Sequence, residues 1–129
     1  MPAAMSAGHG QRLSVSLDVR PERPQAGAQV RWEIRLANDG PERVGLTFAT
    51  AQLGDVVLLQ EGSERWRWSE GRMFAQVISE RELAPGEAWS FSLEGALDVE
   101  PGSYDAVASV RSDPAAPPAR RPVVVDAKR

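Results

Sequence analysis

The stretch Val30-Arg31-Trp32-Glu33-Ile34-Arg35-Leu36 alternates apolar and charged side chains at every position. Successive side chains of a β-strand point to opposite faces of the sheet, so this alternation predicts a strand with one buried face and one solvated face. The run Asn38-Asp39-Gly40-Pro41 comes shortly after it. Because all four of these residue types favour turns, we expect the strand to end there.

The same period of two recurs on both sides of this stretch. Residues 13–19 and 89–93 repeat it clearly, whereas the aliphatic run 56–59 is typical of a strand that is covered on both faces. Further strands are predicted over residues 44–49, 65–69, 73–78, 104–110 and 123–125. Helical periodicity fits poorly throughout, and 11 glycines and 10 prolines interrupt the chain at short intervals.

Eight or nine short strands separated by turn signals predict an all-β fold, an antiparallel β-sandwich of immunoglobulin-like type. A closed barrel is the alternative architecture. The sandwich is favoured by Tyr104, which follows the turn residues Pro101-Gly102 near a late strand. That arrangement resembles the tyrosine corner of Greek-key sandwiches.

The length of 129 residues fits a single domain, and no internal repeat is visible. Residues 1–10 are small or polar and lack periodicity, so we expect a flexible N-terminal tail followed by one β-sandwich domain over residues 11–127. With 42% hydrophobic and 26% charged residues, the chain has the composition of a globular protein.

Composition also excludes several classes of function. A formal net charge of −3 has the wrong sign for a domain that binds phosphate backbones, so no nucleic-acid partner is expected. The absence of cysteine removes disulfides and thiolate metal sites. No apolar run is long enough to span a bilayer and the N-terminus lacks the pattern of a signal peptide, so we expect a cytoplasmic protein without a membrane partner.

The sequence offers little catalytic chemistry. The single histidine, His9, lies in the expected tail, so no general base would be held by a rigid scaffold at neutral pH. Asp98 and Glu100 are most simply a solvated acidic loop, although carboxylates of this kind can bind calcium. We therefore expect no catalytic residue, no metal and no cofactor, and hence a protein that is not an enzyme.

Positive information is concentrated between Thr50 and Gln76, where uncommon residues follow one another in a fixed order. The positions that form the pattern are Asn38, Phe48, Gln52, Asp55, Trp66, Trp68, Ser69, Phe74, Gln76, Pro85, Gly86, Gly102 and Tyr104. This pattern resembles the BsuPI family of intracellular proteinase inhibitors, and the resemblance covers about residues 13–110. One departure is visible, because Gly54 and Val56 stand beside Asp55 where the family commonly has aromatic residues.

The resemblance implies a small cytoplasmic bacterial protein with an immunoglobulin-like sandwich that inhibits an intracellular, subtilisin-like serine proteinase. A rigid scaffold that presents a preorganised loop would keep the ordering cost of such binding low. The alternative function is an immunoglobulin-like protein–protein interaction module without inhibitory activity.

We expect the pattern residues to be mainly structural. Trp66 and Trp68 are two residues apart and should share one strand face, which favours a place in the core over an interface. The arginines opposite them or in the next turn are candidate contacts to an acidic partner; these are Arg65, Arg67 and Arg72. Four connections are candidates for the loop that enters a proteinase: residues 38–43, 61–64, 70–72 and 113–120.

Overall fold

The computed structural model describes residues 12–128, and this part of the chain contains strands and no helix. The ten strands are β1 (Leu13–Arg20), β2 (Gln29–Asn38), β3 (Val44–Phe48), β4 (Gly54–Gln60), β5 (Ser63–Arg67), β6 (Ser79–Leu83), β7 (Ala88–Ala96), β8 (Gly102–Val110), β9 (Ser112–Asp113) and β10 (Ala119–Val125). The expected all-β fold is confirmed, with ten strands where eight or nine were predicted. The expected flexible tail, residues 1–10, lies outside the described residues. Between residues 12 and 128, nothing resembles a membrane-spanning helix.

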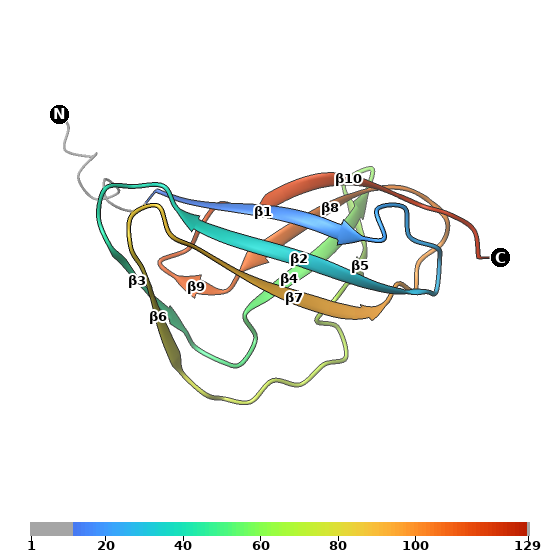
Figure 1. Ribbon diagram of the computed structural model, residues 1–129. Helices are drawn as coiled ribbons and strands as arrows, with labels where there is room; N and C mark the ends of the chain where they lie inside the picture. Colours follow the sequence, from blue (N-terminus) through green and yellow to red (C-terminus); the bar gives the residue numbers. More distant parts are fainter. Residues whose placement is uncertain (1–11, 129) are drawn as a thin grey trace.

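Two antiparallel sheets form the layers of a sandwich (Figure 1). One has the strand order β1-β2-β7 and the other the order β10-β8-β4-β5. These orders correspond to strands A-B-E and G-F-C of an immunoglobulin-like sandwich, with β5 added at the edge. A third, smaller sheet with the order β6-β3-β9 continues from one end, where the chain bends from β2 into β3 and from β6 into β7.

The alternation in β2 builds one wall of the core. Trp32, Ile34 and Leu36 are fully buried between the sheets, while Arg31 and Arg35 on the other face are exposed. The Trp32 ring lies 5.9 Å from that of Trp66, measured between centroids. Burying a large apolar side chain contributes about 1.5–3 kcal/mol, so this face alone favours the sandwich strongly over an open sheet.

The facing wall comes largely from β4 and β8. Val56 and Leu58 of β4 and Ala106 of β8 are fully buried. Val57 and Leu59 are half-buried, so the outer face of β4 is less covered than the aliphatic run predicted. Small residues on β8 leave room for the large side chains that β2 contributes from the opposite sheet.

The bend between the main sheet and the small sheet is fastened by Asn38, which is fully buried. Its Nδ2 donates to the carbonyl oxygens of Glu42 at 2.7 Å and Leu83 at 3.0 Å, and its Oδ1 accepts from the N–H of Gly40 at 3.0 Å. The backbone of Asn38 also receives the N–H of Gly86 in the turn Pro85-Gly86, where Gly86 has φ +80°. One side chain thus joins two turns that are distant in sequence.

At the opposite end, Tyr104 forms the tyrosine corner that the sequence suggested. Its hydroxyl donates to the carbonyl oxygen of Glu100 at 2.5 Å, four residues upstream, and its ring is buried. Gly102 precedes it with φ +154°. The corner therefore fixes how the chain enters β8 from the connection after β7.

The strand predicted over residues 73–78 is wrong. That segment forms no strand, and β6 begins at Ser79 instead, paired with β3. No apolar periodicity predicts β6, because it is an edge strand in which only Leu83 is buried. The two-residue strand β9, which pairs with the end of β3, was also missed.

Asn38→Ala is expected to lower the free energy of unfolding by about 3 kcal/mol, because it removes three hydrogen bonds and leaves their partners unpaired in a buried place. Urea unfolding followed by tryptophan fluorescence measures the change. Glu42→Gln at the same bend is the control, since it keeps the backbone acceptor and its side chain is exposed; it should change stability by less than about 0.5 kcal/mol. Equal stability of Asn38→Ala and the wild type would contradict the role of the side chain.

Candidate functional site

Asp55, at the start of β4, is a buried carboxylate with only 1% of its surface exposed. Its Oδ1 accepts hydrogen bonds from the backbone N–H of Val56 at 2.9 Å and of Ser69 at 3.0 Å. Its Oδ2 accepts the Ser69 hydroxyl at 2.6 Å. Both oxygens are therefore engaged by the chain just beyond the end of β5.

Two arginines cover the same carboxylate. Arg67 approaches Oδ2 at 3.0 Å and Arg111 at 3.4 Å. Arg67 also pairs with Glu64 at 2.9 Å, and its hydrogen bonds to Glu64 and Asp55 raise the pKa of its guanidinium. A buried carboxylate is stable only when it is paired and hydrogen-bonded, and Asp55 meets both conditions.

The connection from β5 to β6, residues 68–78, leads from one sheet to the small sheet along the rim of the molecule (Figure 1). We call it the β5–β6 segment. It begins with a turn in which the N–H of Arg72 donates to the carbonyl of Ser69 at 3.0 Å and Gly71 has φ +79°. Further along, the carbonyl of Ala75 accepts the N–H of Ala51 at 2.9 Å. The segment is thus irregular but attached to the body at defined points.

Trp68 is the main anchor of the segment. Its backbone N–H donates to the carbonyl of Val56 in β4 at 2.9 Å, and its indole Nε1–H donates to the carbonyl of Glu94 in β7 at 3.0 Å. The guanidinium of Arg72 lies over the indole ring at 4.2 Å, and the ring of Phe74 packs against it at 5.8 Å between centroids. Trp68 therefore ties both sheets to the segment.

Gly95 in β7 makes room for this arrangement. Arg72 donates from Nη2 to the carbonyl of Glu94 at 3.0 Å and from Nε to the carbonyl of Trp68 at 2.9 Å. A Cβ at position 95 would lie 2.5 Å from Nη2 of Arg72. A residue larger than glycine would consequently push this arginine from its place.

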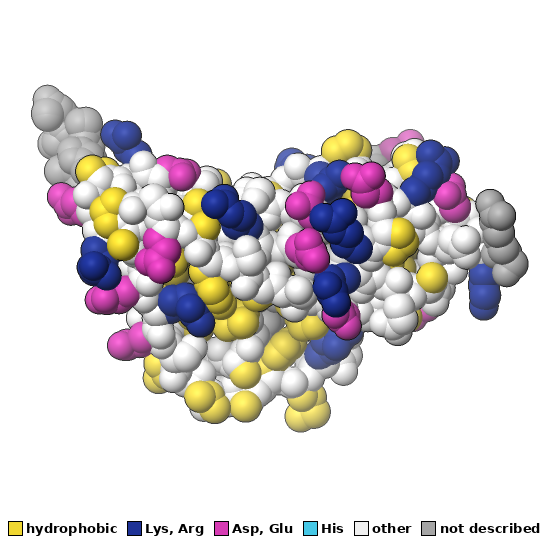
Figure 2. All heavy atoms as spheres, viewed as in Figure 1, with side chains coloured by type: hydrophobic (Ala, Val, Ile, Leu, Met, Phe, Trp, Pro, Cys, Tyr) yellow, Lys and Arg dark blue, Asp and Glu magenta, His cyan; other side chains and the backbone are white. Residues whose placement is uncertain are grey.

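Beyond the anchor, the segment exposes apolar side chains. The exposed fractions are 96% for Met73, 56% for Val77 and 72% for Ile78. Figure 2 shows hydrophobic side chains gathered along the edge of the molecule where Figure 1 draws this connection. Large exposed apolar patches mark interaction surfaces more often than single exposed residues do.

The structure distributes the other pattern residues over the fold. Phe48 is buried in the core, and Gln52 donates from Nε2 to the carbonyl of Gly54 at 3.2 Å. Trp66 and Trp68 are half-buried and pack against the core. Gln76 is exposed in the β5–β6 segment. The pattern therefore includes residues of the core, of the bend at Asn38, of the tyrosine corner and of this segment.

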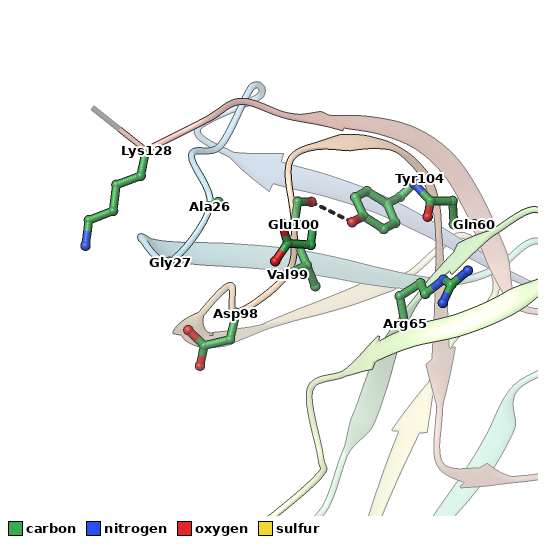
Figure 3. Close-up of a pocket in the computed structure, with 9 residues that line it drawn as sticks. All are labelled: Ala26, Gly27, Gln60, Arg65, Asp98, Val99, Glu100, Tyr104 and Lys128. Atoms are coloured by element: carbon green, nitrogen blue, oxygen red, sulfur yellow. Dashed lines mark hydrogen bonds between the residues drawn. The ribbon is translucent and has the colours of Figure 1, made fainter.

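The three candidate contact arginines lie in different surroundings. Arg67 is held by Asp55 and Glu64, and Arg72 is held over Trp68. Arg65 is exposed on β5 and lines an open pocket of about 620 Å³ at the tyrosine-corner end (Figure 3). The three do not form one basic patch.

The pocket in Figure 3 carries charges of both signs. Asp98 and Glu100 come from the connection between β7 and β8, Arg65 comes from β5, and Lys128 lies beyond the end of β10. Its lining includes no histidine, serine or threonine. Within residues 12–128 no group of three or more acidic or histidine side chains is arranged to hold a metal ion. His9 lies outside the described residues.

Asp55→Asn is expected to lower the free energy of unfolding by about 2 kcal/mol, because the amide replaces a charged acceptor by a donor that the surrounding N–H and O–H groups cannot use. The value stays below that of a fully buried pair because both arginines reach solvent. Arg111→Gln is the control and should cost less than about 1 kcal/mol, since its longer contact is partly exposed. Chemical denaturation compares the two; a larger loss for Arg111→Gln would contradict this assignment.

Gly95→Ala is expected to leave the fold intact and to loosen the β5–β6 segment, because only the flexible end of Arg72 must move. Hydrogen exchange should become faster for the backbone N–H groups of Arg72 and Ala51, because their hydrogen bonds to Ser69 and Ala75 attach the segment to the body. Gly45→Ala, on an exposed face of β3 where an added Cβ has no neighbour within 4 Å, is the matched control. Unchanged exchange in Gly95→Ala would show that Arg72 does not hold the segment.

Comparison with known proteins gives a family and a fold. A family model described as BsuPI, intracellular proteinase inhibitor, matches residues 14–115. No curated protein sequence matches the chain. Among solved structures, the C-terminal domain of wzt is 13% identical with a TM-score of 0.52, and the alignment covers 93% of this chain and 76% of that one.

Two further structures are similar over part of their length. Spo0M, a sporulation control protein from Bacillus subtilis, is 14% identical with a TM-score of 0.51, covering 92% of this chain and 50% of that one. The β-glucosidase EmGH1 from Erythrobacter marinus is 12% identical with a TM-score of 0.51, covering 88% of this chain and 15% of that one. The chain thus spans half or less of these two proteins, and at such identities the likeness shows the fold alone.

The family match covers most of the chain. It includes the β5–β6 segment, the bend at Asn38, the tyrosine corner, and Asp55 with its partners Arg67, Ser69 and Arg111, which we call the Asp55 cluster. It confirms the resemblance that the sequence pattern indicated. The chain belongs to the BsuPI family of intracellular proteinase inhibitors.

Proposed function

We propose that this chain inhibits an intracellular, subtilisin-like serine proteinase without being an enzyme itself, and that it binds through the β5–β6 segment. Membership of a proteinase-inhibitor family supports a proteinase as the partner. The complete segment was not one of the four candidate loops predicted from the sequence, because residues 73–78 were expected to form a strand. One of the four, residues 70–72, is the turn at the start of the segment.

The observation that carries the proposal is the exposure of Met73, Val77 and Ile78 on a segment that is anchored through Trp68, where Arg72 and Phe74 pack on its ring. Exposed apolar side chains in water are unfavourable, and an enzyme cleft that covers them gains the hydrophobic free energy. Because the anchors already order the segment, binding loses less conformational entropy than it would with a free loop.

The backbone of the segment also suits a proteinase. Residues 72–78 belong to no strand or helix. Their described main-chain hydrogen bonds involve the N–H of Arg72 and the carbonyl of Ala75. Most of their polar groups therefore face no main-chain partner in the described structure. A segment whose main-chain groups are unpaired in this way can hydrogen-bond to an exposed strand edge of another protein.

The same proposal assigns no catalytic role to the chain. The open pocket at the tyrosine corner mixes acidic and basic side chains but lacks a nucleophile next to a base among its lining residues. It also lies at the end of the sandwich away from the bend at Asn38. The proposed activity is therefore binding of a proteinase through the β5–β6 segment, and not catalysis in this pocket.

An inhibition assay tests the proposal. Purified chain titrated against purified subtilisin should abolish hydrolysis of a peptide substrate at a molar ratio near one, with an inhibition constant of about nanomolar, as tight protease–inhibitor pairs show. Replacing Met73, Val77 and Ile78 together by serine should raise that constant by at least about 100-fold, because the apolar contacts are removed.

The control carries the same number of changes in a rival loop. Serine replacements of Ala115, Pro117 and Pro118, all exposed, should alter inhibition by only a few-fold. The reverse ranking of the two variants would contradict the assignment to the β5–β6 segment. Unchanged hydrolysis at micromolar wild-type chain would contradict inhibition and leave the non-inhibitory interaction module.

A further inference from the structure

Met73 differs from its neighbours in one respect: the residues on both sides of it are turned toward the same indole ring. Arg72 places its guanidinium 4.2 Å from the centre of the Trp68 ring, and Phe74 packs against that ring from the following position. Met73, between them, is 96% exposed. The two flanking contacts therefore leave the Met73 side chain projecting between two anchored residues.

We call Trp68, with Arg72 and Phe74 packed on its ring, the clasp. The clasp is fixed to both sheets. Trp68 is hydrogen-bonded to β4 through its backbone and to β7 through its indole, and Arg72 donates to the same β7 carbonyl, that of Glu94. The residues on both sides of Met73 are thus attached to the body of the protein through Trp68. This is the geometry of a side chain presented for insertion into a pocket.

We propose that Met73 is the residue that enters the primary specificity pocket of the target proteinase, and that the target therefore accepts a long, unbranched apolar side chain. This inference rests on the proposed inhibitory function. The primary pocket of a serine proteinase receives one side chain of the bound chain and sets specificity by its size and charge. A thioether side chain with three rotatable bonds adapts well to an apolar slot.

Val77 and Ile78 fit this role less well. Both are β-branched, so their side chains are stiff at χ1, and they lead directly into β6 at Ser79. Neither lies between two residues that are held on one ring. They enlarge the apolar surface around Met73, and their contribution to affinity should be smaller.

The position of Met73 also identifies the bond that faces the catalytic serine, the peptide bond from Met73 to Phe74. In cleavage the serine oxygen bonds to the Met73 carbonyl carbon while the C–N bond breaks, and the serine hydroxyl proton passes through the histidine of the enzyme to the Phe74 nitrogen. The oxygen of a water molecule then bonds to the acyl carbon, a proton returns to the serine oxygen, and Met73 is left with a carboxylate. Because Phe74 packs on Trp68, its amine stays beside the acyl carbon and favours resealing, so net cleavage is slow.

The test exchanges the charge of the presented side chain. Met73→Lys should weaken inhibition of subtilisin by at least about 100-fold and create inhibition of trypsin, whose pocket contains an aspartate. Met73→Leu should stay within about 10-fold of the wild type against subtilisin. Val77→Ser is the matched control and should change inhibition by only a few-fold. Thermal unfolding confirms that each variant is folded, as the exposure of these side chains leads us to expect.

Mass spectrometry of the chain after long incubation with subtilisin gives a second readout, with one cleavage expected between Met73 and Phe74. If the wild type inhibits but Met73→Lys inhibits equally well, or if cleavage occurs first at another bond, the role of Met73 is overturned and the inhibitory function stands. If the wild type does not inhibit subtilisin, the proposed function falls and the role of Met73 falls with it.

Discussion

The hydrogen bonds of the buried Asp55 carboxylate determine where the chain leaves the second sheet, and the exposed segment depends on that point. Ser69 is held by both oxygens of Asp55, and Arg67 by one of them. Trp68, between these two residues, is thereby placed to reach across to β7. Without these hydrogen bonds, the start of the connection to β6 would not be held in place, and its apolar side chains would lose their common anchor, Trp68.

The core and the segment use apolar residues in opposite ways. On β2, alternation sends every second side chain into the space between the sheets, where Trp32, Ile34 and Leu36 are covered completely. In the β5–β6 segment, Phe74 packs against the ring of Trp68, whereas Met73 and Ile78 are exposed to water. The buried core stabilises the fold. The protein can therefore carry an exposed apolar surface that does not itself contribute to stability.

The strands could be predicted wherever a strict period of two existed, as in residues 30–36 and 89–93, because one face of each of those strands packs against the core. Residues 73–78 were predicted to form a strand because they are rich in apolar side chains. Their apolar positions do not alternate, and this was the available signal against a strand. The polar strand β6 could not be found in this way, since pairing with β3 rather than burial defines it.

Neighbours in space explain the rest of the difference. Nothing in the spacing of Trp68 and Glu94 indicates their hydrogen bond. Nothing in the sequence distinguishes Gly95 from other strand residues either, because its close approach to Arg72 arises only in the fold. The sequence pattern did single out Asp55, Trp68, Ser69 and Phe74 together. The fold brings these four positions into one connected structure, from the buried carboxylate to the clasp beneath the exposed segment.

The proposed binding mode can be tested by a crystal structure of the chain bound to subtilisin whose catalytic serine is replaced by alanine. We expect the enzyme cleft to cover the β5–β6 segment, and we expect the Asp55 cluster and Trp68 to keep the geometry of the free chain. A complex in which the cleft is filled by residues 113–120, or by the tyrosine-corner end of the sandwich, would contradict it.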